Sequence, residues 1–124
     1  MTINKVLLTV LVGLSISLST IALEVGDQAP NFTLEATDGK TYTLEQFHNK
    51  QAIVIAWYPR AFTSGCTIEC KSLANNGHLL KALDVTYFMA SVDPLETNKE
   101  FAAENEADFP LLSDPSKKVA AAYD

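Results

Sequence analysis

The stretch that decides the fold runs from Gln51 to Cys70 and reads QAIVIAWYPRAFTSGCTIEC. Its apolar first part, 51–58, has the length and composition typical of a buried strand. The residues from Thr67 to about Leu83 have the pattern of a helix. The sequence therefore predicts a central strand over 52–57, followed by a turn and by a helix that starts beside Cys66.

The second half of this stretch contains Cys66 and Cys70, the two cysteines of the chain. At the start of a helix the first backbone N–H groups have no intrahelical partner, and the helix dipole is positive there. Such a position favours a thiolate, which is the nucleophilic form of a cysteine side chain. The sequence therefore predicts that Cys66 is a nucleophile.

Composition excludes several classes of protein. A chain of 124 residues has room for one small domain, and 48% hydrophobic with 19% charged residues is typical of a globular protein rather than a disordered one. The net charge of -6, with Arg60 as the single arginine, argues against nucleic acid as a partner. The chain has one cysteine pair and two histidines, His48 and His78, which do not have the paired spacing of zinc ligands, so a four-ligand zinc site has no support. We expect no metal and no cofactor.

The N-terminal segment differs from the rest of the chain. Lys5 is its one charged side chain, and an uncharged run follows from Val6 to Leu23. Residues 1–22 therefore resemble a secretory signal peptide, although a run of this length also just reaches that of an uncleaved membrane anchor. Either alternative predicts that the domain over 23–124 is exported, periplasmic or secreted, with a membrane partner only if the segment is retained. In an oxidising compartment the two cysteines could also form a structural disulfide.

The remainder of the chain alternates strand and helix patterns. Asp38-Gly39 supplies the left-handed residues that a tight hairpin needs. We expect Asp93 to cap and Pro94 to open the helix that follows the second buried strand, with Phe101 and Ala103 facing inward. The predicted strands are 32–34, 41–43, 52–57, 86–92 and 110–112, and the predicted helices are a turn over 44–47, 66–83 with a bend at 75–77, one from 94, and 115–123 capped by Asp114. This order implies parallel crossovers and an α/β fold.

Five separated motifs carry a resemblance to a known family. They read YPRAFTSGC over 58–66, VGDQAPNF over 25–32, DG at 38–39, SVD over 91–93 and FPLLSD over 109–114. These motifs follow one another along the chain in the same order as in the peroxiredoxins, which the chain therefore resembles over essentially all of 25–123. This resemblance implies the thioredoxin-like fold, and it points to the branch of the family that is similar to the bacterioferritin comigratory protein.

The resemblance implies roles for individual residues. Cys66 would be the peroxidatic cysteine, which attacks a peroxide and becomes a sulfenic acid. Thr63 would hydrogen-bond the thiolate and the incoming peroxide. Backbone N–H groups at Gly65 and Cys66 would polarise the departing oxygen. Pro59 would form a wall of the pocket and shield the sulfenic acid.

Cys70 is the resolving cysteine that the resemblance implies. Helix residues four apart have Cβ atoms about 5–6 Å apart, whereas a disulfide needs roughly 3.8 Å. We therefore expect the first helical turn to unwind when Cys66 and Cys70 pair, and to refold on reduction by a thioredoxin-like donor. Related sequences often place the second cysteine five residues after the first, so this chain departs from the usual spacing.

Two further departures from the family pattern concern the rest of the site. Ser64 stands where the signature usually has proline. Peroxiredoxins also use an arginine on a later strand, and Arg60 does not match that position. The sequence ends at Asp124, where the family would continue into antiparallel strands, so we interpret it as a fragment that is incomplete at its C-terminus. The open sheet edge predicts poor folding of these 124 residues alone.

Three functions are compatible with the residues. The first is an antioxidant thiol peroxidase that reduces hydrogen peroxide and organic hydroperoxides. The second is an exported thiol–disulfide oxidoreductase, although the four-residue spacing of Cys66 and Cys70 is not the Cys-x-x-Cys pattern of thioredoxins. The third is an inactive redoxin domain with a structural disulfide, which the helical spacing disfavours.

Overall fold

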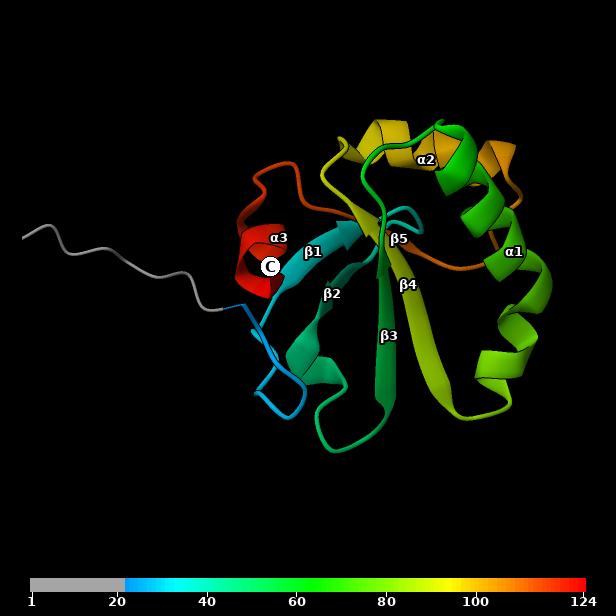
Figure 1. The fold of residues 1–124 in the computed structure, drawn as a ribbon. Helices are drawn as coiled ribbons and strands as arrows, with labels where there is room; N and C mark the ends of the chain where they lie inside the picture. Colours follow the sequence, from blue (N-terminus) through cyan, green and yellow to red (C-terminus); the bar gives the residue numbers. More distant parts are fainter. Residues whose placement is uncertain (1–21) are drawn as a thin grey trace, which may run out of the picture.

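The computed structural model describes residues 22–124, so the predicted signal segment over 1–22 lies almost wholly outside the described residues. Two successive strands come first in the described residues, and helices and strands then alternate along the chain (Figure 1). The strands are β1 (Thr33–Ala36), β2 (Thr41–Thr43), β3 (Ala52–Trp57), β4 (Val85–Ser91) and β5 (Leu111–Ser113), and the helices are η1 (Leu44–Gln46, a 3₁₀ turn), α1 (Ser64–Lys81), α2 (Leu95–Glu104) and α3 (Lys118–Tyr123). Among these helices none is long and apolar enough to cross a membrane.

The five strands form one sheet in the order β2-β1-β5-β4-β3. β3 pairs in parallel with β4, and β4 in parallel with β5, so α1 and α2 are the connections between parallel strands. β1 and β2 form the predicted hairpin, and β1 also pairs antiparallel with β5. The α/β fold and the parallel crossovers are thereby confirmed.

A hydrophobic cluster lies on each face of the sheet. Tyr87, Met89 and Leu111 belong to the cluster that α1 and α2 cover, whereas the alternate residues Phe88 and Leu112 belong to the other cluster. Side chains of η1 and α3 pack against the second cluster. This division follows from the alternation of side chains along a strand, and it places α1 and its cysteines on the first face.

β3 has the predicted bounds but not the predicted place in the sheet. It is an edge strand that pairs with β4 alone, and Val54 is 43% exposed. The expectation of a buried, central strand is therefore wrong for the described residues. Periodicity alone identifies a strand, but which strands flank it depends on pairings that are distant in sequence.

Three helix predictions also need correction. α1 continues without interruption through Asn75–Gly77, where the buried Gly77 lies against the hydroxyl of Tyr87. The N-cap of α2 is Pro94 rather than Asp93, and Ala103 is exposed, while Phe101 is buried as predicted. α3 begins at Lys118, three residues later than expected, although the carboxylate of Asp114 accepts a hydrogen bond from the Ala120 N–H.

Candidate active site

The loop between β3 and α1 places Cys66 in the first turn of a helix. α1 begins at Ser64 with Thr63 as its N-cap, and the Thr67 N–H donates to the Thr63 carbonyl at 2.9 Å. The backbone N–H of Cys66 is therefore one of the helix-start groups that lack an intrahelical acceptor. This confirms the position at a helix start that the sequence predicted for Cys66.

The same loop has an unusual backbone conformation. Phe62 has a φ of 63°, in the left-handed region that bulky residues rarely adopt. Its ring packs edge-on against Phe101 of α2, with ring centroids 5.3 Å apart. The Thr63 Oγ1 donates a hydrogen bond to the Arg60 carbonyl at 3.1 Å, rather than acting as a side-chain cap of α1. A strained segment of this kind persists where its surroundings hold it in place.

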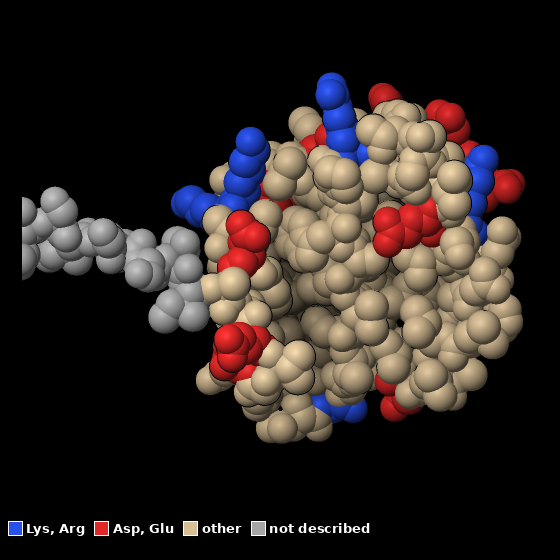
Figure 2. Space-filling view, viewed as in Figure 1, with Lys and Arg blue, Asp and Glu red and all other residues tan. Residues whose placement is uncertain are grey.

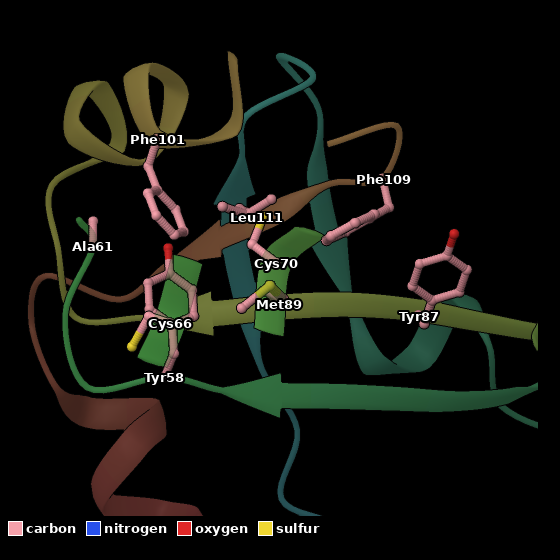
Figure 3. Close-up of a cluster of buried hydrophobic side chains, with 9 residues drawn as sticks. All are labelled: Tyr58, Ala61, Cys66, Cys70, Tyr87, Met89, Phe101, Phe109 and Leu111. Atoms are coloured by element: carbon pink, nitrogen blue, oxygen red, sulfur yellow. The ribbon is translucent and has the colours of Figure 1, made fainter. Parts of the chain in front are cut away.

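Both cysteines are free thiols within the cluster on the α1 face of the sheet. Cys66 is 5% exposed and Cys70 is fully buried. Figure 3 shows the Tyr58 ring beside Cys66, with its hydroxyl directed toward α2 and Phe101. Burial raises the pKa of the Cys70 thiol to about 11, and the carboxylate of Glu69 adds to the rise. Cys70 is therefore protonated at neutral pH while α1 is intact.

A buried polar network lies next to the cysteines. The Tyr58 hydroxyl donates to Asn98 Oδ1, and Asn98 Nδ2 donates to Ser113 Oγ at 2.8 Å. Burial is the main cause that raises the pKa of the Tyr58 hydroxyl, so this group remains a neutral donor. Asn98 has no exposed surface, and it links α2 to β5 and to the residue that follows β3.

Asp93 makes a further connection to the loop. Its Oδ2 accepts a hydrogen bond from the Ala61 N–H at 2.8 Å and another from Ser91 Oγ at 3.0 Å. Sequence reasoning assigned Asp93 to a helix cap and did not single out Asn98. Local patterns could not reveal either contact, because the bonded residues are 32 and 40 positions apart. The one available signal for Asn98 is a polar residue three positions before Phe101, on the same helix face.

The four residues predicted for the site lie on one continuous segment. Pro59 and Thr63 are exposed on the loop, and Cys66 and Cys70 are on the buried side of α1. Pro59 also lines an open pocket of about 560 Å³, and Cys66 is not among the lining residues, which are Trp57, Tyr58, Pro59, Val92, Lys117, Ala120, Ala121, Tyr123 and Asp124. The structure therefore places the four predicted residues on one loop and the helix that follows it, and of the four only Pro59 lines this pocket.

Charged groups are sparse in the middle of one face of the molecule. In Figure 2 the acidic and basic side chains lie mostly toward the periphery, and the hollowed centre is uncharged. Within residues 22–124, no three His, Cys, Asp or Glu side chains form a group that could hold a metal ion.

Comparison with known proteins places the chain in a family. The model of the AhpC/TSA family matches residues 25–124. The chain is 37% identical over 98 residues to a putative peroxiredoxin bcp of Haemophilus influenzae, covering 79% of this chain and 63% of that protein. It is 36% identical over 97 residues to peroxiredoxin Bcp of Escherichia coli, covering 78% of this chain and 62% of that protein. The chain thus spans less than two thirds of the length of these curated relatives.

Solved structures that are similar to this chain are also peroxiredoxins. Peroxidoxin BcpB from Mycobacterium tuberculosis superposes with a TM-score of 0.74 at 30% identity, covering 79% of this chain and 64% of that one. Peroxiredoxin Q from Xanthomonas campestris superposes with a TM-score of 0.70 at 26% identity, covering 74% of this chain and 58% of that one. The thioredoxin-like fold expected from the motifs is confirmed by these similarities. The chain belongs to the AhpC/TSA family, and it is similar to the peroxiredoxins of the Bcp and peroxiredoxin Q type.

Proposed function

We propose that this chain carries the peroxidatic centre of a thiol-dependent peroxidase that reduces hydrogen peroxide and organic hydroperoxides. The observation that carries the proposal is the position of Cys66, in the first turn of α1 directly after a strained loop that contains Thr63. The family match over 25–124 supports the same chemistry. A thiolate at a helix start is stabilised by unpaired N–H groups and by the helix dipole.

The first step is attack of the Cys66 thiolate on one oxygen of the peroxide. An S–O bond forms and the O–O bond breaks, and the departing oxygen takes up a proton to leave as water or an alcohol. Cys66 becomes a sulfenic acid, so the sulfur is oxidised and the peroxide is reduced by two electrons. The N–H groups at the start of α1 are available to stabilise negative charge on the departing oxygen.

Thr63 and Pro59 assist this step in the proposal. The Thr63 hydroxyl donates to the Arg60 carbonyl in the resting structure, so its oxygen lone pairs remain available to accept a hydrogen bond from a peroxide O–H. A bond from Thr63 to the thiolate requires rotation of that hydroxyl. Pro59, on the exposed side of the loop, has a packing role beside the site.

Cys70 completes the cycle as the resolving residue. Its sulfur attacks the Cys66 sulfenic acid, the S–S bond forms, and the hydroxyl of the sulfenic acid leaves as water. In the intact helix this step is disfavoured, since Cys70 is fully buried with a pKa of about 11. Unwinding of the first turn frees Cys66 from its helical position, so that its sulfur can approach Cys70. A thioredoxin-like dithiol then reduces the disulfide.

The cellular role follows from this chemistry and from the N-terminal segment. We infer antioxidant defence and redox homeostasis in an exported location, periplasmic or secreted, with residues 1–22 as the export signal. A retained segment would make the protein membrane-anchored. The support for export is the uncharged run over 6–23, which is a property of the sequence alone.

Two single variants test the proposal. Cys66→Ser should abolish peroxide consumption, whereas Cys70→Ser should still consume one equivalent of peroxide and stop as a sulfenic acid. Mass spectrometry of the peroxide-treated wild type should show a Cys66–Cys70 disulfide within one chain. A Cys66→Ser variant that loses insulin reduction instead would indicate a thiol–disulfide oxidoreductase, and one that loses only stability would indicate a structural disulfide. Either result would contradict the proposal.

A further inference from the structure

The carboxylate of Asp93 is directed away from the helix that it precedes. No side-chain bond caps α2, and the N-cap position is taken by Pro94. Asp93 Oδ2 instead accepts from the Ala61 N–H at 2.8 Å and from Ser91 Oγ at 3.0 Å. The carboxylate therefore connects the end of β4 to the loop in front of α1, which is 32 residues away along the chain.

The loop that receives this bond is the strained one. Ala61 is 6% exposed, and the next residue, Phe62, has the left-handed φ of 63°. Thr63 and the first turn of α1 follow directly. A hydrogen bond to an ionised acceptor is among the stronger kinds, and a strained backbone needs such restraints to persist. The Asp93 carboxylate is thus placed to hold the conformation from which Cys66 reacts.

We propose that Asp93 is a positioning residue that locks the loop over 59–63, and that breaking its bond to Ala61 is part of the unwinding that brings Cys66 to Cys70. The proposal deepens the peroxidase function given above and rests on it for its chemical consequence. The locked loop keeps Cys66 in the first turn of α1, where it meets the peroxide. The released loop lets the sulfenic acid reach Cys70.

This role predicts opposite effects on two consecutive steps. Without the carboxylate the locked loop is less populated, so oxidation of Cys66 by peroxide should slow. Conversion of the Cys66 sulfenic acid to the disulfide should accelerate, because that step needs the open loop. The two rates are separable by adding one equivalent of peroxide and following sulfenic acid and disulfide by mass spectrometry.

Three variants separate geometry from charge and from general damage. Asp93→Ala removes the acceptor. Asp93→Asn keeps an acceptor without the charge, because both hydrogen bonds end on Oδ2 and the amide oxygen of asparagine can take the place of that atom. Asp108→Ala is the matched control, since Asp108 is an exposed carboxylate that pairs with Lys81 rather than with the loop.

Hydrogen exchange in the reduced proteins measures the lock without any peroxide chemistry. We expect Asp93→Ala to speed exchange over 59–66 by about ten- to a hundredfold, the equilibrium ratio for one bond to a charged group. The β1–β2 hairpin should exchange as in the wild type. Asp93→Asn should exchange at a rate between those of the wild type and Asp93→Ala, because its amide oxygen keeps an acceptor but not the charge. Asp108→Ala should stay close to wild-type exchange in the loop.

Several results would overturn the lock. Asp93→Ala could leave hydrogen exchange in the loop unchanged, which would contradict the proposal. Asp93→Asn could exchange as fast as Asp93→Ala, which would also contradict it. If exchange in the β1–β2 hairpin rose by the same factor in Asp93→Ala, the variant would be destabilised in general rather than in the loop. If the rates of Cys66 oxidation and of disulfide formation both fell, the predicted opposite effects would be contradicted. A failure of the proposed peroxidase function would be recognised separately, because the wild type would then consume no peroxide. The exchange experiment uses no peroxide, so it would still test the role of Asp93.

Discussion

Cys70 has an ionisation that is coupled to the folded state of α1. Burial raises the pKa of its thiol to about 11, and Glu69 contributes a smaller rise in the same direction. The unfolded chain has a cysteine pKa of about 8.5. The neutral thiol therefore stabilises the folded protein fully below about pH 8.5, and this contribution is lost as pH rises toward 11.

The pH dependence of unfolding tests this coupling. In a Cys66→Ser background, the urea midpoint should fall more steeply between about pH 8.5 and 11 than it does when Cys70 is also replaced by Ala, which cannot ionise. If the urea midpoints of the two proteins changed with pH in parallel, the Cys70 thiol would have the same pKa in the folded and the unfolded protein, and the predicted coupling would be wrong. The measurement is equilibrium denaturation by urea at fixed ionic strength.

At the scale of a single element, α1 shows why helix propensity is a weak guide. Asn75-Asn76-Gly77 predicts a bend, yet the helix runs unbroken from Ser64 to Lys81. Gly77 is buried, and a Cβ at this position would collide with the Tyr87 hydroxyl of β4. The absence of a side chain at Gly77 lets α1 pack closely on β4. This packing outweighs the low helix propensity of glycine.

Gly77→Ala should therefore destabilise the protein although alanine is the better helix former. We expect a loss of about 1–3 kcal/mol from overpacking. Gly65→Ala is the matched control in the same helix, with open space at its Cβ, and propensity predicts a gain of up to about 1 kcal/mol. The thermal midpoints of the two variants report the difference, and a smaller loss for Gly77→Ala in a Tyr87→Phe background would identify the clash. Equal effects at the two glycines would rule it out.

The β1–β2 hairpin illustrates an element that local sequence does predict. Gly39 has a φ of 80°, as the Asp-Gly pair required, and Asp38 accepts hydrogen bonds from the Lys40 N–H and the Tyr42 hydroxyl. All of these groups lie within a few residues of one another. The turn is therefore encoded where it forms, whereas the cap of α2 was mispredicted because Asp93 bonds to a distant loop.

At the scale of the molecule described over 22–124, Asn98 joins parts of the fold that are far apart in sequence. Its side chain connects Tyr58, the residue directly after β3, with Ser113 of β5, and its exposed surface is zero. Buried polar groups are favourable only while their partners are present, because an unpaired donor or acceptor keeps its full desolvation cost. The network therefore makes α2 and two strands depend on one amide.

Asn98→Ala should cost at least about 2 kcal/mol, since it leaves the Tyr58 and Ser113 hydroxyls without their partner. Lys99→Ala is the control on the same helix, because it removes a surface pair with Glu96 and should change stability by less than about 1 kcal/mol. Denaturant unfolding measures both. A loss for Asn98→Ala no larger than that for Lys99→Ala would contradict the role of the network.

The free edge of β3 has a consequence for association between molecules. Within the described sheet β3 pairs only with β4, and Val54 leaves 43% of its surface exposed there. Exposed apolar edge strands are sites of aggregation, and a lysine on such an edge opposes it. Val54→Lys should therefore reduce light scattering on heating with little change in the thermal midpoint.

Ile55→Lys provides the comparison for the edge. Ile55 lies on the same strand but packs against the buried cluster of the other sheet face, so a lysine there should lower the thermal midpoint. Unchanged aggregation in Val54→Lys would show that association occurs at another surface. The two variants separate an edge effect from a core effect on one strand.

The sequence by itself determined the alternation of strands and helices, the hairpin at Asp38-Gly39 and the position of Cys66 near the start of a helix. These depend on periodicity and on neighbours along the chain, so they are readable locally. Tertiary structure alone decided that β3 lies at the edge, that Asn98 is buried and that Asp93 bonds to Ala61. Each of these depends on partners that only the completed sheet brings together. The Ala61–Asp93 hydrogen bond joins residues 32 positions apart, and the Tyr58–Asn98 hydrogen bond joins residues 40 positions apart.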